Sequence, residues 1–474
     1  MEAPKHILRL AQQAYFKIPA YRKFLKSNGW KYKSINSKNF FKLPIMGKKT
    51  YIKAFSFQNF FPDKKVPEFA FSSSGSSGEP TFWFRNKEQE LAGAKQHAVA
   101  FSHTLKIKPE KSTLIIVAFS MGVWIAGNFT ASCARLLRQS GWNITVVTPG
   151  IEIADTLHIL KIIAPEYDQI ILAGYPSLVA DILQEAIANS ISIPSQLRII
   201  TAGDSFEESW RKNMLSRIPK SVPEHIISIY GSADAGIIGH ETPFSILLRQ
   251  ELLKNTGLMR SLIPGKHAKQ PAIFQYDPKH IYIESINQEL LFSVNSATPL
   301  VRYNINDRGI IIQQSEIYAL LKKHRVSKKL LGLAKKSAFP IVIKYGRTDV
   351  AVTFYALNIY PEHIDSALRD KKITSLINGG YKAYSQTETK TLNEKLIFEV
   401  EPSKKYRGNR HRILIQKTII NHLIKLNTEF RKLHSTIGRK SWPEIKIKKI
   451  TRETTPGIRA LIGKQGKKPK LILT

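Results

Sequence analysis

A run of small hydroxylated and flexible residues stands between two aromatic stretches. The segment "SSSGSSGEPT" spans residues 72–81, preceded by "EFAF" and followed by "FWF". Gly75 and Gly78 permit backbone angles that other residues avoid, and the serines and Thr81 add hydroxyl donors. Successive amides and hydroxyls of this kind can surround phosphate oxygens. The segment therefore fits a phosphate-binding loop between two strands, while a serine-rich turn or a flexible linker has a similar composition.

Four further stretches carry residues suited to the same chemistry, and they follow the serine-rich segment in order. They read "IYGSADAG" at 229–236, "PLVRYNINDRG" at 299–309, "YGRTDVAVTFYALNIYPEHIDSAL" at 345–368 and "GKQGKKPK" at 463–470. Together with the first segment they resemble the ordered motifs of adenylate-forming ligases, and within that superfamily the chain is most similar to phenylacetate–CoA ligase. An early stretch, "FFKLPIMGKKTYI" at 40–52, is also similar to that family, so the resemblance covers nearly the whole chain.

The resemblance implies an AMP-forming acid–thiol ligase. Such an enzyme joins a carboxylic acid, here with an aromatic acid as one candidate, to ATP and releases pyrophosphate. It then passes the acyl group to a thiol, usually that of coenzyme A. Because attack on the α-phosphate concentrates negative charge, the site needs amides, cations and Mg²⁺. Two alternatives stay open: an adenylating enzyme with an amine, hydroxyl or carrier-protein acceptor, and a non-catalytic basic binding module that retains the fold.

The resemblance also implies roles for individual residues. Asp234 would hold Mg²⁺ where relatives carry Glu, Arg347 would reach ribose and phosphate, and Lys467 would bridge the substrate carboxylate and the α-phosphate, with Lys464 as the alternative. Asp349 would be the hinge about which the C-terminal domain rotates. The implied contacts to ATP or AMP are Ser74, Gly75, Ser76, Ser77, Gly78 and Thr81 at the β- and γ-phosphates, Gly203, Asp204, Tyr230, Gly231 and Ser232 around adenine, and Asp307 at the ribose hydroxyls.

Some positions depart from the pattern of the relatives. Ile305-Asn306 replaces the usual Thr-Gly pair before Asp307, so a different turn is expected there. Ala356 replaces a glycine that lines the thiol path, and its methyl group is expected to narrow this path. The candidate walls of the acyl pocket are Met121, Trp124 and Tyr175. Aromatic walls suit an aryl or arylacetyl acid, and the same residues would also suit an ordinary hydrophobic core.

Alternating strand and helix patterns have to position these residues. Buried-strand patterns at 114–119, 143–147, 170–172, 197–201 and 226–229 alternate with helical patterns at 124–139 and 176–189. This alternation predicts an α/β fold with a largely parallel sheet. With the resemblance, it predicts a large N-terminal adenylate-forming domain at 1–346 and a small mobile α+β C-terminal domain at 347–474. Further helices are expected at 4–27, 88–105, 361–369 and 410–433, with a basic exposed helix between 316 and 349.

Composition limits the class of protein. The 474 residues include 72 Lys and Arg against 36 Asp and Glu, a net charge of +36, which favours polyanionic partners such as nucleotides or coenzyme A, although a bias of the whole proteome would give the same number. The single cysteine, Cys133, excludes an internal disulfide framework. The uncharged stretch 114–134 is interpreted as strand, loop and helix rather than a membrane span. We therefore expect a cytoplasmic enzyme with small-molecule partners, or an acyl carrier protein as acceptor, rather than a nucleic-acid-binding protein.

Overall fold

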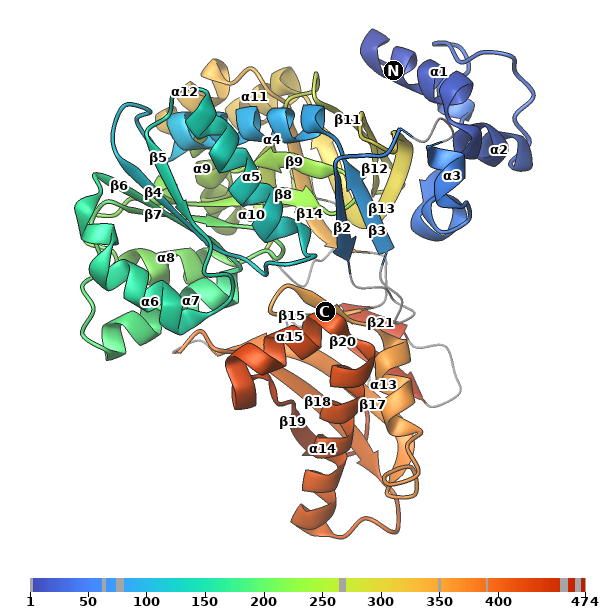
Figure 1. Cartoon of the computed structure of the whole chain (residues 1–474), viewed down its shortest axis with the longest axis vertical. Helices are drawn as coiled ribbons and strands as arrows, with labels where there is room; N and C mark the ends of the chain where they lie inside the picture. The colour runs from blue at the N-terminus through green and yellow to red at the C-terminus, as the bar shows by residue number, and fades with distance from the viewer. Residues whose placement is uncertain are drawn as a thin grey trace.

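The computed structural model of the chain describes residues 3–61, 65–73, 81–263, 270–347, 351–388, 391–451, 459–464 and 470–473. Its larger part is built on a 12-stranded mixed sheet with the order β11-β12-β13-β14-β10-β9-β8-β7-β6-β4-β5, to which β1 adds beside β13. A smaller lobe, coloured orange to red in Figure 1, follows β14 in the chain and lies beneath the larger part. The predicted α/β fold class is confirmed.

The parallel half of the large sheet consists of β4 (Thr113–Ala118), β5 (Ile144–Val147), β6 (Gln169–Gly174), β7 (Leu197–Thr201) and β8 (Ile226–Ser232). Helices α4 (Lys87–Val99) and α5 (Ile125–Gln139) cover one face, and α6 (Ile153–Ile162), α7 (Pro176–Ala188) and α8 (Glu208–Ser216) cover the other. Alternate residues of β4 enter the two hydrophobic layers: Leu114 and Ile116 on one side, Ile115 and Val117 on the other. Because β4 is buried on both faces, its sequence is apolar throughout.

The antiparallel half consists of β9 (Gly236–His240), β10 (Ala272–Gln275), β11 (Ile281–Ile286), β12 (Glu289–Val294), β13 (Leu300–Ile312) and β14 (Ile341–Arg347). Helices α9 (Pro243–Lys254), α10 (Thr256–Leu262), α11 (Gln314–Lys323) and α12 (Lys328–Lys336) pack around its core. A separate hairpin, β2 (Phe69–Ser73) and β3 (Thr81–Arg85), flanks the serine-rich segment, as the sequence predicts.

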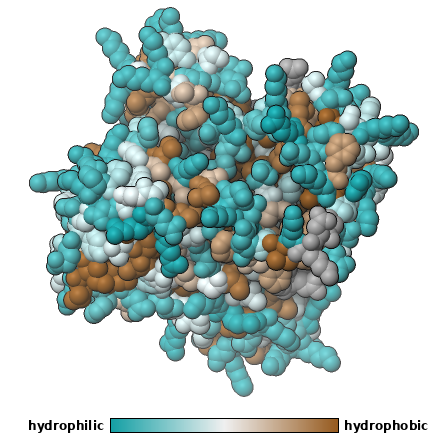
Figure 2. All heavy atoms as spheres, turned by 45° about the horizontal axis from the view of Figure 1, so that its top comes forward, coloured by the Kyte–Doolittle hydropathy of each residue, from teal (hydrophilic) through white to brown (hydrophobic). Residues whose placement is uncertain are grey.

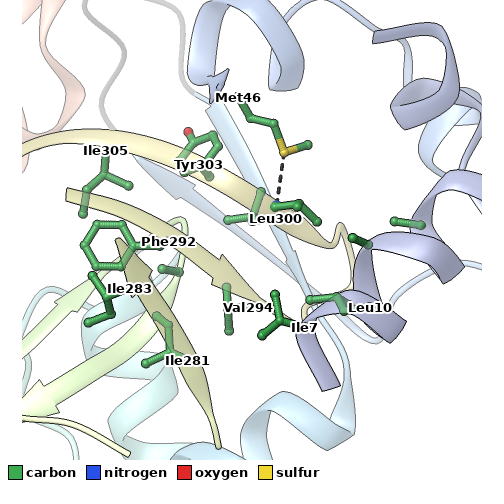
Figure 3. Close-up of a cluster of buried hydrophobic side chains, with 14 of the residues drawn as sticks. Ile7, Leu10, Met46, Ile281, Ile283, Phe292, Val294, Leu300, Tyr303 and Ile305 are labelled. Carbon is green, nitrogen blue, oxygen red and sulfur yellow. Dashed lines mark hydrogen bonds between the residues drawn. The ribbon is translucent and has the colours of Figure 1, made fainter. Parts of the chain in front are cut away.

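The N-terminal segment packs against strands that come much later in the chain. Its helices are α1 (Lys5–Lys17), α2 (Pro19–Ser27) and α3 (Phe57–Phe60), and its short strand β1 (Met46–Gly47) runs parallel to β13. Figure 3 shows Ile7 and Leu10 of α1 beside Val294 and Leu300, all members of one buried cluster. Met46 Sδ accepts a hydrogen bond from the Val301 N–H at 3.1 Å. This packing fixes the residues that follow β1.

The C-terminal lobe has its own hydrophobic core, composed of residues from 352 to 461. It contains the hairpin of β15 (Val352–Phe354) and β16 (Leu357–Ile359) and a five-stranded sheet with the order β19 (Glu444–Ile447), β18 (Glu394–Pro402), β17 (Ile377–Thr387), β20 (Arg459–Lys464) and β21 (Lys470–Leu473). Its helices are α13 (Pro361–Leu368), α14 (Gly408–Leu426) and α15 (Thr428–Ile437). The domain boundary at 346/347 stays a prediction.

Three predicted helices are interrupted. The helix expected at 4–27 breaks before Pro19, which begins α2, because proline disfavours a helical residue in front of it. The helix expected at 410–433 ends at Asn427, whose side chain accepts the Phe430 N–H at 3.0 Å and caps α15. The basic segment forms two helices, α11 and α12, rather than one. Helices α3, α6, α8, α9 and α10 were not predicted.

The surface carries most of the charge. Figure 2 shows a face on which hydrophilic side chains predominate, with smaller hydrophobic areas between them. Exposed large apolar side chains among the described residues include Val66, Val123 and Phe82. A search of the described residues finds no helix long and apolar enough to cross a membrane, and the stretch 114–134 forms β4 and part of α5.

Candidate active site

A cavity of about 320 Å³ lies at the carboxyl ends of the parallel strands, between the large part and the C-terminal lobe. Tyr175 follows β6, Gly203 follows β7 and Gly231 ends β8, and all three line the cavity. The C-terminal lobe contributes Ala356 and Glu429. Ligands of open α/β sheets bind outside the carboxyl ends of the strands, so this cavity is the candidate active site.

Asp234 and Lys48 line the same cavity. Pairing of Gly47 with Asn304 places Lys48 beside the part of β13 that leads to Asp307. Burial raises the pKa of Asp234, while the charge of Lys48 and a 2.7 Å hydrogen bond from the Tyr303 hydroxyl oppose that rise. Burial lowers the pKa of Lys48, and Asp234 opposes this shift in turn. A carboxylate and a cation thus share a partly dehydrated region, where charges interact strongly.

Arg85 holds the turn that carries Asp234. It is 1% exposed, and its Nη2 donates to the carbonyl oxygens of Ala233 at 2.6 Å and Asp234 at 3.3 Å. These bonds tie the last residue of β3, at the end of the hairpin away from the serine-rich segment, to the turn that follows β8. Sequence reasoning missed Arg85 because nothing around it indicates a partner so distant in the chain.

Asp307 lies behind the cavity wall in a network of polar groups. It is 1% exposed, its Oδ2 accepts the Tyr230 hydroxyl at 2.6 Å, and Arg347 Nη1 lies 3.3 Å from its Oδ1. The Tyr230 ring is buried and stacks on Phe274 with centroids 5.2 Å apart. Arg347 lines the cavity, whereas Tyr230 and Asp307 do not. Adenine stacking by Tyr230 and ribose binding by Asp307 stay predictions.

The segment before Asp307 is not the expected turn: it lies within β13, where the pairing with β12 shifts register. Asn306 adopts a φ of 67°, a left-handed conformation that glycine takes freely and asparagine tolerates better than most residues. The Asn304 side chain accepts the Asn306 N–H at 2.7 Å and supports this conformation. Asn304, Ile305 and Asn306 all line the cavity.

Of the other residues predicted to lie around adenine, some line the cavity and one does not. Ser232 lines the cavity together with Gly203, which has a φ of 87°. A Cβ at Gly203 would lie 3.0 Å from the Tyr175 ring and 3.1 Å from the Ala356 Cβ, so glycine is needed for this close approach. Asp204 does not line the cavity; its Oδ1 accepts the N–H of Ser205 at 2.7 Å.

The other end of the cavity is apolar. Phe129 of α5, Ile229 of β8 and Ile237 of β9 line it, and all three belong to the core layer that covers the parallel strands. Tyr175 also lines it, and burial raises the pKa of its phenol to about 12, so the hydroxyl stays neutral. Of the other two predicted pocket residues, Trp124 lines an adjoining smaller cavity and Met121 lines neither.

His97 of α4 is a polar group at this apolar end. It is 3% exposed and lines the cavity, and its ring centroid lies 6.4 Å from that of Phe129. Its Nδ1 lies 2.9 Å from the Gly93 carbonyl oxygen, four residues earlier in the helix. Sequence reasoning did not single out His97, because a histidine inside a helix has no local signature of a binding site.

The tip of the β15–β16 hairpin enters the site from the C-terminal lobe. Ala356 lines both the main cavity and the adjoining one of about 120 Å³, and it has a φ of 62°. The Tyr355 hydroxyl donates to Asp181 Oδ2 of α7 at 2.7 Å, and the Tyr355 N–H donates to Glu394 Oε2 at 2.9 Å. The same Glu394 oxygen accepts the Ser177 hydroxyl at 2.5 Å. Buried hydrogen bonds thus hold the hairpin against the large part.

Several predicted site residues lie outside the described residues: Ser74, Gly75, Ser76, Ser77, Gly78, Asp349 and Lys467. Thr81 is described at the start of β3, where it is 4% exposed and its hydroxyl has no hydrogen-bond partner among the described residues. Lys464 ends β20, which pairs with β17 of the C-terminal sheet.

The donors at the cavity fit the Mg²⁺ that the resemblance implies. Mg²⁺ prefers oxygen ligands and is usually held by one or two carboxylates, waters and the phosphates of a nucleotide. Asp234 supplies one such carboxylate at the cavity wall. The described residues contain no group of three or more potential metal ligands.

A scan of the sequence against protein-family models and a search of the curated proteins both find no match. Solved structures do match. The chain is similar to 2-hydroxyisobutyryl-CoA ligase in complex with 2-HIB-AMP and CoA in the thioesterification state, with a TM-score of 0.65, 16% identity, and coverage of 95% of this chain and 88% of that chain. It therefore has the fold of an adenylate-forming ligase.

Two further structures of that ligase differ in conformation. An open conformation with 2-HIB-AMP and CoA gives a TM-score of 0.53 at 16% identity, covering 95% of this chain and 89% of that chain. The postadenylation state with R3-HIB-AMP gives 0.51 at 15% identity, covering 94% and 85%. Among these three, the thioesterification state agrees best with the arrangement of the two parts of this chain.

Proposed function

We propose that this protein is an ATP-dependent ligase that converts a carboxylic acid to an acyl-adenylate and then transfers the acyl group to coenzyme A. The observation that carries the proposal is one cavity with two ends, an Asp234–Lys48–Arg347 end suited to Mg²⁺ and phosphates and an apolar end suited to the acid. The fold shared with a CoA ligase supports it. The order of the sequence motifs supports a phenylacetate–CoA ligase-like enzyme acting in the cytoplasm, where ATP and coenzyme A are at hand.

In the first half-reaction, a carboxylate oxygen of the acid attacks the α-phosphorus of ATP, and the bond to pyrophosphate breaks. Negative charge grows on the phosphate oxygens, so preorganised cations lower the barrier. Arg347 and Lys48 stand at the cavity for this purpose, and Mg²⁺ held by Asp234 would neutralise the phosphates. Lys467 is proposed to join them when the C-terminal lobe takes its adenylation position. Tyr230 and Asp307 then support the wall against which the nucleoside binds.

In the second half-reaction, the thiolate of coenzyme A attacks the acyl carbonyl carbon, and AMP leaves. The adjoining cavity offers a path for the thiol arm, because it shares Tyr175 and Ala356 with the main cavity and continues past Trp124 and Leu178. Its lining is mostly apolar, which suits the pantetheine chain better than a free amine or water. This path favours a pantetheine thiol, as in coenzyme A or a carrier protein, over an amine or hydroxyl acceptor.

The test is to incubate the pure protein with ATP, Mg²⁺ and a panel of aryl and aliphatic acids, and to follow pyrophosphate release with and without coenzyme A. We expect release to depend on one class of acid and to turn over only with coenzyme A. Acyl-adenylate that accumulates regardless of coenzyme A would indicate another acceptor. No release with any acid, from a protein that still binds ATP, would indicate the non-catalytic module.

A further inference from the structure

We propose that the acid carries a hydrogen-bond donor, a hydroxyl or a ring N–H, at the end away from its carboxylate, and that His97 Nε2 accepts this hydrogen bond. The inference rests on the proposed function, because it names the class of acid that the apolar end of the cavity takes. His97 is a specificity-determining residue that lies away from the reacting atoms.

The hydrogen bond within α4 fixes the tautomer of His97. A carbonyl oxygen can only accept, so Nδ1 must carry the proton that it shares with the Gly93 oxygen at 2.9 Å. Burial lowers the pKa of the imidazole below its ordinary value, although the bond to Gly93 opposes this shift. The ring is therefore neutral near pH 7, and Nε2 presents a lone pair rather than a proton.

The position of the ring directs this lone pair away from its own helix. Nδ1 faces back toward the preceding turn of α4, so Nε2 lies on the opposite edge of the ring. Among the described residues, Nε2 has no hydrogen-bond partner, although the side chain is 3% exposed and lines the cavity. Nε2 is open to the cavity rather than sealed in the core, so a ligand that donates to it takes the place of cavity water.

Among the described residues, no side-chain donor is found within hydrogen-bond distance of His97 Nε2. The Thr130 hydroxyl also lines the cavity, however, and the pKa of His240 is lowered by burial and by the nearby His97. Phe101 and Phe129 contact its ring, with centroids 5.7 and 6.4 Å away, and Ile229 and Ile237 complete this part of the lining. Charged side chains also line the cavity: Lys48, Asp234, Arg347 and Glu429. An acid with a fully apolar tail would leave Nε2 dehydrated and unpaired. A site that binds a polar group in this way rejects the analogue that lacks it.

The experiment uses pairs of acids that differ in one donor: 4-hydroxyphenylacetate with phenylacetate, 4-hydroxybenzoate with benzoate, 4-hydroxycinnamate with cinnamate, and indole-3-acetate with naphthalene-1-acetate. Binding of each to the full-length protein is measured by calorimetry, which needs no turnover. We expect at least one donor-bearing acid to bind about tenfold more tightly than its partner. His97→Phe should abolish that preference, and His97→Gln, which keeps an acceptor, should retain part of it.

Two controls separate the outcomes. His103→Gln changes an exposed histidine that does not line the cavity and should leave all affinities unchanged. Melting temperatures report whether each variant is folded. The proposal fails if no pair shows a preference for the donor, or if His97→Phe keeps the wild-type preference. Pyrophosphate release with the same acids tests the proposed function separately, because donor-dependent binding without any release would overturn the ligase and leave the role of His97 standing.

Discussion

The Tyr355 hydroxyl and the Asp181 carboxylate join the C-terminal lobe to the large part through a 2.7 Å hydrogen bond. Tyr355 is 4% exposed and Asp181 is 1% exposed, so neither group reaches water while the hairpin is docked. A buried carboxylate without its partner is costly. This pair therefore favours the arrangement that resembles the thioesterification state.

Removing this bond should slow only the second half-reaction. In Tyr355→Phe, Asp181 loses its donor, and we expect acyl transfer from a supplied acyl-adenylate to fall about tenfold, the usual effect of one bond to a charged group. Pyrophosphate release in a single turnover should stay unchanged. Tyr384→Phe is the matched control, because its hydroxyl bonds to Glu399 within the lobe at 2.9 Å. Equal losses in both half-reactions would show that Tyr355 acts on overall stability instead.

Ala356 should set the width of the thiol path. Its φ of 62° is strained for alanine, so Ala356→Gly should raise the free energy of unfolding by about 0.5–1 kcal/mol and increase kcat/KM for coenzyme A. Ala356→Val adds volume beside Gly203 and should reduce this kcat/KM more than about tenfold. Steady-state kinetics with varied coenzyme A measure both effects. A glycine variant with a lower kcat/KM would contradict the proposed path.

Lys48 should contribute to adenylation. Lys48→Ala removes a cation from the cavity that holds Asp234, and we expect pyrophosphate release to fall about 100-fold. The adjacent Lys49 is exposed and does not line the cavity, so Lys49→Ala is the control for the loss of one charge. If both variants lose activity equally, the effect comes from the net charge rather than from the site.

The C-terminal lysine can be assigned by comparing two variants. Lys467→Ala should reduce acyl-adenylate formation by about 10²–10³-fold and spare transfer from a supplied acyl-adenylate, because that step uses the other position of the lobe. Lys464→Ala should leave both steps near the wild-type rate. The reverse result would assign the role to Lys464, and no effect from either would remove this tail from the mechanism.

His363 should make the C-terminal lobe sensitive to acid. Its Nδ1 accepts the Tyr360 N–H at 3.3 Å, and burial lowers its pKa to about 4. The unfolded chain therefore binds a proton near pH 6.5 that the folded chain does not, so stability is present above that pH and is lost as the pH falls toward 4. Between pH 7 and 4.5, wild type should lose about 1–3 kcal/mol more than His363→Gln. Chemical unfolding at the two pH values measures this difference, and parallel losses would contradict it.

The sequence predicted those helices and strands whose pattern lies within their own residues. The apolar run of β4 and the periodic pattern of α7 follow from burial, and both are confirmed within one residue at their ends. The breaks at Pro19 and Asn427 were missed, although proline and a capping asparagine are local signals that could have placed them. Helix α6 was missed although Ile153, Leu157 and Leu160 recur at helical spacing, a local signal that could have placed it.

The site was predictable where motif residues lie at strand ends. Gly203, Gly231, Ser232, Asp234 and Arg347 come together at the cavity because the topology places those ends side by side. Arg85 and His97 were not predictable, since their importance depends on contacts made in three dimensions. Arg85 reaches the Ala233 carbonyl oxygen across 148 positions of the chain, and no local pattern contains that relationship.

The pairing of the N-terminal segment with β13 has a consequence for synthesis. Met46 bonds to Val301, which the ribosome adds 255 positions later. At roughly 5–20 residues per second, α1 and α2 emerge tens of seconds before the strands that bury them. During that interval Ile7, Leu10, Tyr21 and Phe24 have no partner from β11–β13 to cover them. The nascent chain must therefore keep this apolar surface from aggregating until most of its length has been made.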